Sequence, residues 1–118
     1  MKKKRKWGQN FLIDPKIANQ ILNIANISSD DLVLEIGPGR GILTEGLIHK
    51  ARELTVLEID PELCSRLKKQ FDTYSSFHLF ETDALKFDYS CIGPRYKVVS
   101  NLPYYAATHI LKRLIHYR

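Results

Sequence analysis

Four short apolar runs alternate with amphipathic segments, and this pattern limits the chain to few folds. The apolar runs cover residues 32–36, 54–59, 77–81 and 96–100. Helical patterns cover residues 15–26, 42–50, 61–71 and 106–118. Strands that alternate with helices over short connections are typical of a parallel sheet with right-handed crossovers. Since both faces of such a sheet are covered, its strands are apolar along most of their length. The expected fold class is α/β.

Two of the expected helices carry start signals. Asp14 precedes Pro15, and Asp60 precedes Pro61, so each aspartate is placed to cap a helix. The first of these helices has four apolar residues that we assign to one face: Ile17, Ile21, Leu22 and Ile24.

The net charge of +5 is concentrated at the N-terminus, where residues 2–6 read Lys-Lys-Lys-Arg-Lys. Residues 7–118 carry 13 basic and 13 acidic side chains, so their charges cancel. A cationic arm of this kind either contacts nucleic-acid phosphates or is a solvated terminus, and the run alone favours neither.

Composition excludes several classes of protein. The hydrophobic share of 44% and the charged share of 26% are ordinary for a globular chain. No apolar run reaches the ~18–20 residues that a membrane span needs, and the basic start lacks the apolar core of a secretory signal. Cys64 and Cys91 are too few for a disulfide scaffold and lack metal-ligand spacing. We therefore expect a reduced, cytoplasmic protein without a metal site.

A glycine-rich segment, residues 35–41 (Glu-Ile-Gly-Pro-Gly-Arg-Gly), lies between an expected strand and an expected helix. Glycines let the backbone turn sharply and approach a ligand, and ligands of open α/β sheets bind at this position. The third glycine follows Gly39 by two residues rather than three, and Pro38 removes an amide donor. This spacing argues against a dinucleotide oxidoreductase and favours a ligand without a diphosphate. A tight structural turn is the alternative.

Two carboxylates follow later strands. Glu58 lies 21 residues after Gly37, and a carboxylate at this spacing binds the ribose diol in folds of this kind. Asp60 is the competing candidate for this role, although its position before Pro61 suits a helix cap. Asp83 follows the third strand. Its carboxylate either accepts the exocyclic amine of an adenine or caps the turn before residues 84–85.

The most specific signal is Asn101-Leu102-Pro103-Tyr104-Tyr105, directly after the fourth apolar run. An Asn oxygen and a backbone carbonyl can accept the two hydrogens of a planar amine and direct its lone pair toward a methyl donor. Pro103 stiffens the loop, and Tyr104 can stack on the base. A turn with a buried tyrosine is the alternative. Because all these motifs follow strand ends, we expect them at one edge of the sheet.

These motifs, with Gly8-Gln9-Asn10-Phe11-Leu12 after the basic arm, resemble the ribosomal RNA adenine dimethyltransferases. The resemblance extends over nearly the whole chain. It implies a Rossmann-like class I fold and S-adenosylmethionine as the methyl donor. It also implies dimethylation of the exocyclic amine of adjacent adenines in small-subunit rRNA, during ribosome maturation.

The resemblance also implies the roles of particular residues. Cofactor binding would fall to Asn10, Leu12, Gly37, Gly39, Glu58, Ile59, Asp83 and Asn101. Within this set Glu58 would hold the ribose hydroxyls, Ile59 would pack on the adenine, and Asp83 would bind its amine. The methyl-transfer site would consist of Asn101, Leu102, Pro103 and Tyr104, with Asn101 and the Leu102 carbonyl orienting the target amine.

The family pattern continues with further strands and a helical C-terminal domain, so we expect this sequence to be the N-terminal part of a longer protein, cut after the fourth strand and its helix. By this resemblance residues 1–12 are a basic arm and cofactor-closing segment, and residues 13–118 are the N-terminal part of a methyltransferase domain. The expected partner is small-subunit rRNA or the immature small subunit. Apolar surface that lacks its usual cover would favour self-association.

Three other functions stay open beside the leading one. They are a non-catalytic RNA- or ribosome-binding module that keeps the cofactor fold, a large-subunit rRNA methyltransferase of the macrolide-resistance type, and a DNA adenine methyltransferase. Leu102, rather than Ile, favours the small-subunit group, and residues 8–12 argue against a DNA enzyme.

Overall fold

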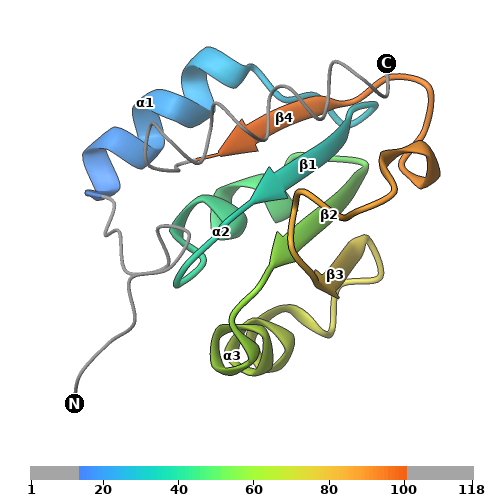
Figure 1. Ribbon diagram of the computed structural model, residues 1–118. Coiled ribbons are helices and arrows are strands. Elements are labelled where there is room, and N and C mark those ends of the chain that lie inside the picture. The colour runs from blue at the N-terminus through green and yellow to red at the C-terminus, as the bar shows by residue number, and fades with distance from the viewer. Residues whose placement is uncertain (1–13, 101–118) are drawn as a thin grey trace.

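A parallel four-stranded sheet forms the centre of the molecule. The computed structural model describes residues 14–100. Its strands are β1 (Leu32–Ile36), β2 (Glu53–Glu58), β3 (Phe77–Glu81) and β4 (Lys97–Ser100). They lie in the order β3-β2-β1-β4, and their arrows point the same way in Figure 1. The α/β class is therefore confirmed.

Three α-helices connect or precede the strands: α1 (Pro15–Ala25), α2 (Ile42–Ile48) and α3 (Pro61–Phe71). All three match expected helices closely, although α2 ends two residues early. The helix expected over residues 106–118 lies outside the described residues.

The predicted caps are confirmed. The Asp14 side chain accepts a hydrogen bond from the Lys16 N–H at 2.7 Å, and Asp60 accepts one from the Glu62 N–H at 2.9 Å. Each cap satisfies an N–H group that has no partner within the first helical turn. At the end of α1, Asn26 takes the left-handed conformation, with φ 49°, and its N–H bonds to the Leu22 carbonyl.

The predicted buried face of α1 is partly wrong. Ile17 and Ile24 are 49% and 83% exposed. The face that packs on the core instead contains Ala18, Ile21, Leu22 and Ala25. These positions follow the i, i+3, i+4, i+7 spacing of one helical stripe, which the two small alanines concealed in the sequence.

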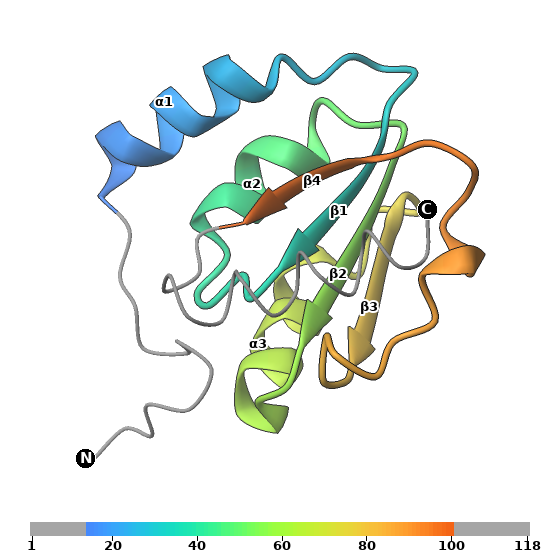
Figure 2. The ribbon, with the colours of Figure 1, turned by 45° about the horizontal axis from the view of Figure 1, so that its top comes forward.

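Helices cover one face of the sheet. In Figure 2, α2 and α3 lie behind the strands, and α1 lies beside α2 and β4. Side chains of alternate strand residues fill this layer, including Val33, Leu54, Val56 and Val99. From the helices, Leu47, Leu67 and Phe71 complete the core.

The opposite face is covered by a loop, residues 82–96, which contains the short 3₁₀ helix η2 (Tyr89–Cys91). Phe87 and Tyr89 of this loop pack in a core cluster with Leu34, Ile36 and Leu57. The Tyr89 hydroxyl donates a hydrogen bond to the Ala84 carbonyl at 2.6 Å, which holds the loop in a compact form. The sequence did not predict this layer.

Candidate functional site

The carboxyl ends of the strands meet at one edge of the sheet. Ile36 is paired with both Leu57 and Ser100, and Glu58 is paired with Glu81. The residues that follow β1, β2 and β3 are therefore neighbours in space. The structure thus brings together the predicted site residues Gly37, Gly39, Glu58, Ile59 and Asp83.

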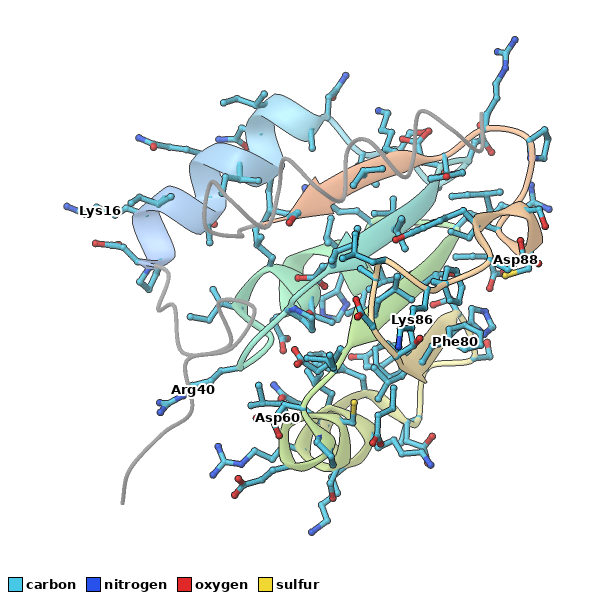
Figure 3. The ribbon with its side chains drawn as sticks, viewed as in Figure 1. Lys16, Arg40, Asp60, Phe80, Lys86 and Asp88 are labelled. Carbon is cyan, nitrogen blue, oxygen red and sulfur yellow. The ribbon has the colours of Figure 1, made fainter. Side chains whose placement is uncertain are left out.

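The turn after β1 needs its glycines for two different reasons. Gly37, Gly39 and Gly41 all have positive φ, at 68°, 60° and 90°, a region that other residues rarely adopt. A Cβ on Gly41 would lie 3.1 Å from Leu67 and 3.2 Å from Phe71, so this glycine lets the start of α2 approach α3. Arg40 is exposed and extends away from the body of the molecule (Figure 3).

Glu58 is the buried acceptor of the site. Its side chain is 2% exposed, and its Oε2 accepts a hydrogen bond from the Asp60 N–H at 2.9 Å. Its Oε1 is buried and has no hydrogen-bond partner among the described residues. Burial raises the pKa of this carboxyl, while the backbone N–H groups of Asp60, Ile59 and Gly39 act in the opposite direction. One carboxylate oxygen is therefore held by the backbone and the other is left for a donor.

The two other predicted acids have structural tasks. Asp60 caps α3 through its Oδ1, and Figure 3 shows this residue at the start of that helix. Asp83 caps the turn after β3, because its Oδ1 accepts from the Leu85 N–H at 2.9 Å. The turn-capping alternative for Asp83 is thus present in the structure. Within residues 14–100, its second oxygen receives no hydrogen bond.

Sequence reasoning missed two polar contacts next to the site. The Ser100 hydroxyl donates to the Ile36 carbonyl at 3.2 Å, which ties the end of β4 to the residue before Gly37. Glu35 of β1 is 1% exposed and accepts a hydrogen bond from the Thr44 hydroxyl of α2 at 2.5 Å. The available signal was an acid within the otherwise apolar run of β1.

Six predicted site residues lie outside the described residues: Asn10, Leu12, Asn101, Leu102, Pro103 and Tyr104. Over residues 14–100, no three His, Cys, Asp or Glu side chains gather as metal ligands would. Nor does that part of the chain contain a helix with the length and apolar character needed to cross a membrane.

The sheet order, the glycine turn after β1 and the buried acid at the end of β2 define a Rossmann-like class I methyltransferase fold. Solved structures support this class. A dimethyladenosine transferase from Plasmodium falciparum is 33% identical, with a TM-score of 0.77, and the match covers 91% of this chain and 38% of that one. The 23S rRNA methyltransferase ErmE is 32% identical, also with a TM-score of 0.77, over 88% of this chain and 42% of that one.

Within this class the chain belongs to the family described as Ribosomal RNA adenine dimethylase, whose profile matches residues 1–118. Ribosomal RNA small subunit methyltransferase A from Pseudomonas syringae pv. tomato is 42% identical over 115 residues, which is 95% of this chain and 43% of that protein. The chain spans about two fifths of the length of the curated relatives that it matches.

A further structural neighbour was solved with a ligand. The N-methyltransferase NodS from Bradyrhizobium japonicum WM9, in complex with S-adenosyl-L-homocysteine, is 27% identical with a TM-score of 0.56. That match covers 62% of this chain and 38% of NodS.

Proposed function

We propose that this chain binds S-adenosylmethionine and belongs to an enzyme that dimethylates the exocyclic amine of adjacent adenines in small-subunit rRNA during ribosome maturation. Family membership supports the reaction and the RNA class. The observation that carries the cofactor assignment is the buried Oε1 of Glu58, which has no partner within residues 14–100.

The residues present fit this cofactor. An ionised carboxylate only accepts hydrogen bonds, and the two hydroxyls of a ribose are donors. Glu58 offers its free oxygen beside a turn in which Gly37 and Gly39 keep the backbone open to close approach. In the proposed site Ile59 packs on the adenine, and Asp83 accepts its amine with the oxygen that the turn does not use.

The methyl-transfer end of the proposed site comes from residues outside the described part. The cofactor supplies an electrophilic methyl group when it is bound. Asn101 and the Leu102 carbonyl accept the hydrogens of the target amine, Pro103 stiffens the loop, and Tyr104 stacks on the target base. No strong base is required, because the amine attacks before it loses a proton. Asn10 and Leu12 close over the methionine end.

The proposed partners follow from the same reaction. The target adenine must leave any stack to reach the methyl group, so the RNA site is single-stranded or locally opened. Residues 2–6 add five positive charges that attract phosphates in a salt-dependent way. This function places the protein in the cytoplasm with the ribosome. Self-association through apolar surface is a separate proposal, for which exposed Phe80 and Val98 are the support.

The cofactor assignment is tested by titrating S-adenosylmethionine into the full chain in a calorimeter. Glu58→Gln keeps an oxygen for the Asp60 N–H but turns an amide donor toward the ribose, so we expect affinity to fall tenfold or more. Glu62→Gln, an exposed change in the first turn of α3, is the matched control and should bind like the parent. Equal binding by the Glu58 variant would contradict the assignment.

The reaction is tested with immature small subunits, a labelled cofactor and Asn101→Ala. In the full-length enzyme we expect this variant to lose nearly all methyl transfer and to keep most of its cofactor affinity. Binding without transfer by the parent chain would instead support the non-catalytic module. The similarity to ErmE favours large-subunit rRNA as the alternative substrate, so naked 23S rRNA belongs in the same assay. Preferential methylation of that RNA would reverse the substrate assignment.

A further inference from the structure

Glu35 is a fully buried acid for which the proposed reaction has no use. It lies on β1 two residues before Gly37 and is 1% exposed, and Thr44, which holds it from α2, is 0% exposed. The Thr44 hydroxyl donates to Glu35 Oε1, whereas Glu35 Oε2 is buried and has no partner among residues 14–100. Such a group requires an explanation, because a buried carboxylate without a cation is costly.

The surroundings of Glu35 favour its protonated form. In the sheet it is paired with Val56 and Val99. From α2 it meets the uncharged Thr44, and the titratable group of the described residues that acts on it is Glu58, which is also acidic. Burial, with a smaller contribution from Glu58, raises the pKa of Glu35 to about 8, and the hydrogen bond from Thr44 acts in the opposite direction. Below this pKa the side chain is a neutral acid.

The contact between Glu35 and Thr44 spans the glycine turn. Glu35 precedes the turn on β1, and Thr44 follows it in the first turn of α2. The hydrogen bond thus connects the two ends of the loop that contains Gly37 and Gly39. A change in this bond would move the loop relative to Glu58, whose carboxyl is also approached by the Gly39 N–H.

We propose that Glu35 is a positioning residue of the nucleoside site, which fixes the glycine turn through Thr44 and does so as an uncharged acid. This inference rests on the proposed function, since it concerns the site assigned there to S-adenosylmethionine. Ionised Glu35 would place a second negative charge beside Glu58 in the core, and hydration of that charge would loosen the packing of α2 on β1.

The test compares the full chain with Glu35→Gln by titration of S-adenosylhomocysteine between pH 6.5 and pH 9. Glutamine keeps the acceptor for Thr44 and has no charge at any pH. We expect the two proteins to bind within threefold at pH 6.5 and the parent to bind about tenfold more weakly than the variant at pH 9. Because the two proteins are compared at the same pH, any protonation change of the ligand affects both affinities equally and cancels in their ratio.

Two results would overturn the proposal. One is a tenfold loss of affinity in Glu35→Gln at pH 6.5, because the charge would then be required. The other is a pair of parallel pH profiles. Since the parent still binds in both cases, these failures leave the proposed cofactor site intact. A parent that binds no S-adenosylhomocysteine would contradict the cofactor site itself, and the positioning role with it.

Variants of Thr44 test whether Glu35 positions the glycine turn through the Thr44 hydroxyl. Thr44→Val removes the hydroxyl at nearly constant volume and should weaken binding at pH 6.5 by about tenfold, whereas Thr44→Ser should restore it to within threefold. Glu45→Gln, at the neighbouring exposed position of α2, is the control and should leave the pH profile unchanged. Equal binding by the Val and Ser variants would show that the hydroxyl does not position the turn.

Discussion

The two faces of the sheet are built in different ways. Three helices cover one face, where a cluster centred on Leu47, Leu54 and Phe71 is almost completely buried. Among residues 14–100, one loop covers the middle of the other face, and near the two edges Phe80 and Val98 are 42% and 40% exposed. Both faces belong to the same four strands, so the difference comes from the connections and not from the strands.

This difference indicates that the helix-covered face is the more rigid of the two. Side chains alternate between the faces along each strand, so Glu35 lies on the same side as Val33, and Glu58 on the same side as Val56. Glu35 reaches Thr44 of α2 in the helix-covered layer, whereas Glu58 lies at the end of β2, where its Oε2 is held by the Asp60 N–H. The site polar groups are held by the densely packed face, and the loop-covered face contributes the turn that begins at Asp83.

The largest expected effect contrasts two leucines of β2. Leu54 is buried under helices and Leu57 under the loop, at 0% and 1% exposure. Leu54→Ala should lower the free energy of unfolding by about 4 kcal/mol, and Leu57→Ala by about 2 kcal/mol, because a loop can collapse into a cavity more easily than packed helices. Urea unfolding of both variants measures the difference. Equal losses would show that the two covers are equally rigid.

The next effect concerns the pH dependence of stability. Because the folded-state pKa of Glu35 is raised from 4.5 to about 8, the folded chain retains a proton that the unfolded chain releases. Stability from this group is therefore complete below pH 4.5 and is lost progressively as the pH rises toward 8. Urea titrations at pH 6 and pH 8 should show this loss in the parent and not in Glu35→Gln. If the free energy of unfolding changed equally with pH in both proteins, the pH dependence would come from other groups.

A smaller effect tests the loop that covers the second face. Tyr89→Phe removes the hydrogen bond to the Ala84 carbonyl and should cost about 1 kcal/mol in the free energy of unfolding. Hydrogen exchange should increase within residues 82–96 and stay constant in α2. Tyr74→Phe, at an exposed tyrosine after α3, is the matched control. An unchanged loop in the Tyr89 variant would mean that ring packing alone holds it.

The smallest effect on stability is expected at the exposed apolar residues of the second face. Val98→Thr should change the free energy of unfolding by less than about 0.5 kcal/mol. Phe80→Thr should cost about 0.5–1 kcal/mol, because the Phe80 ring packs on Phe87 with the ring centroids 5.2 Å apart. Together they should lower the self-association measured by sedimentation at high concentration. Ile24→Thr, on the 83% exposed residue of α1, is the control and should leave association unchanged. If all three variants associate like the parent, this face is not the contact surface.

Local chemistry explains what the sequence predicts well. Pro15 and Pro61 follow capping aspartates, so the starts of α1 and α3 depend only on neighbouring residues. Likewise, the strands are apolar runs limited by polar turns. The positions of the glycine turn and of Glu58 are predictable for the same reason, since both occur at strand ends. Their roles in ligand binding stay a prediction.

The features that the sequence does not predict depend on contacts between segments far apart in the chain. Residues 82–96 have no regular apolar spacing, and their structure forms because Phe87 and Tyr89 meet Leu34 and Leu57 from other parts of the chain. The burial of Glu35 likewise depends on α2 packing over β1. The Ser100 contact requires β4 to lie beside β1 rather than beside β3, a reversal of strand order that no local pattern encodes.

That reversal of strand order also determines when the chain can finish folding. β1 is a central strand, yet its neighbour on one side, β4, is made 61 residues after the end of β1. On a translating ribosome, β1 would therefore expose an unpaired and strongly apolar edge until β4 has emerged. Nascent chains that stall between β3 and β4 should accordingly be the ones that aggregate or recruit chaperones.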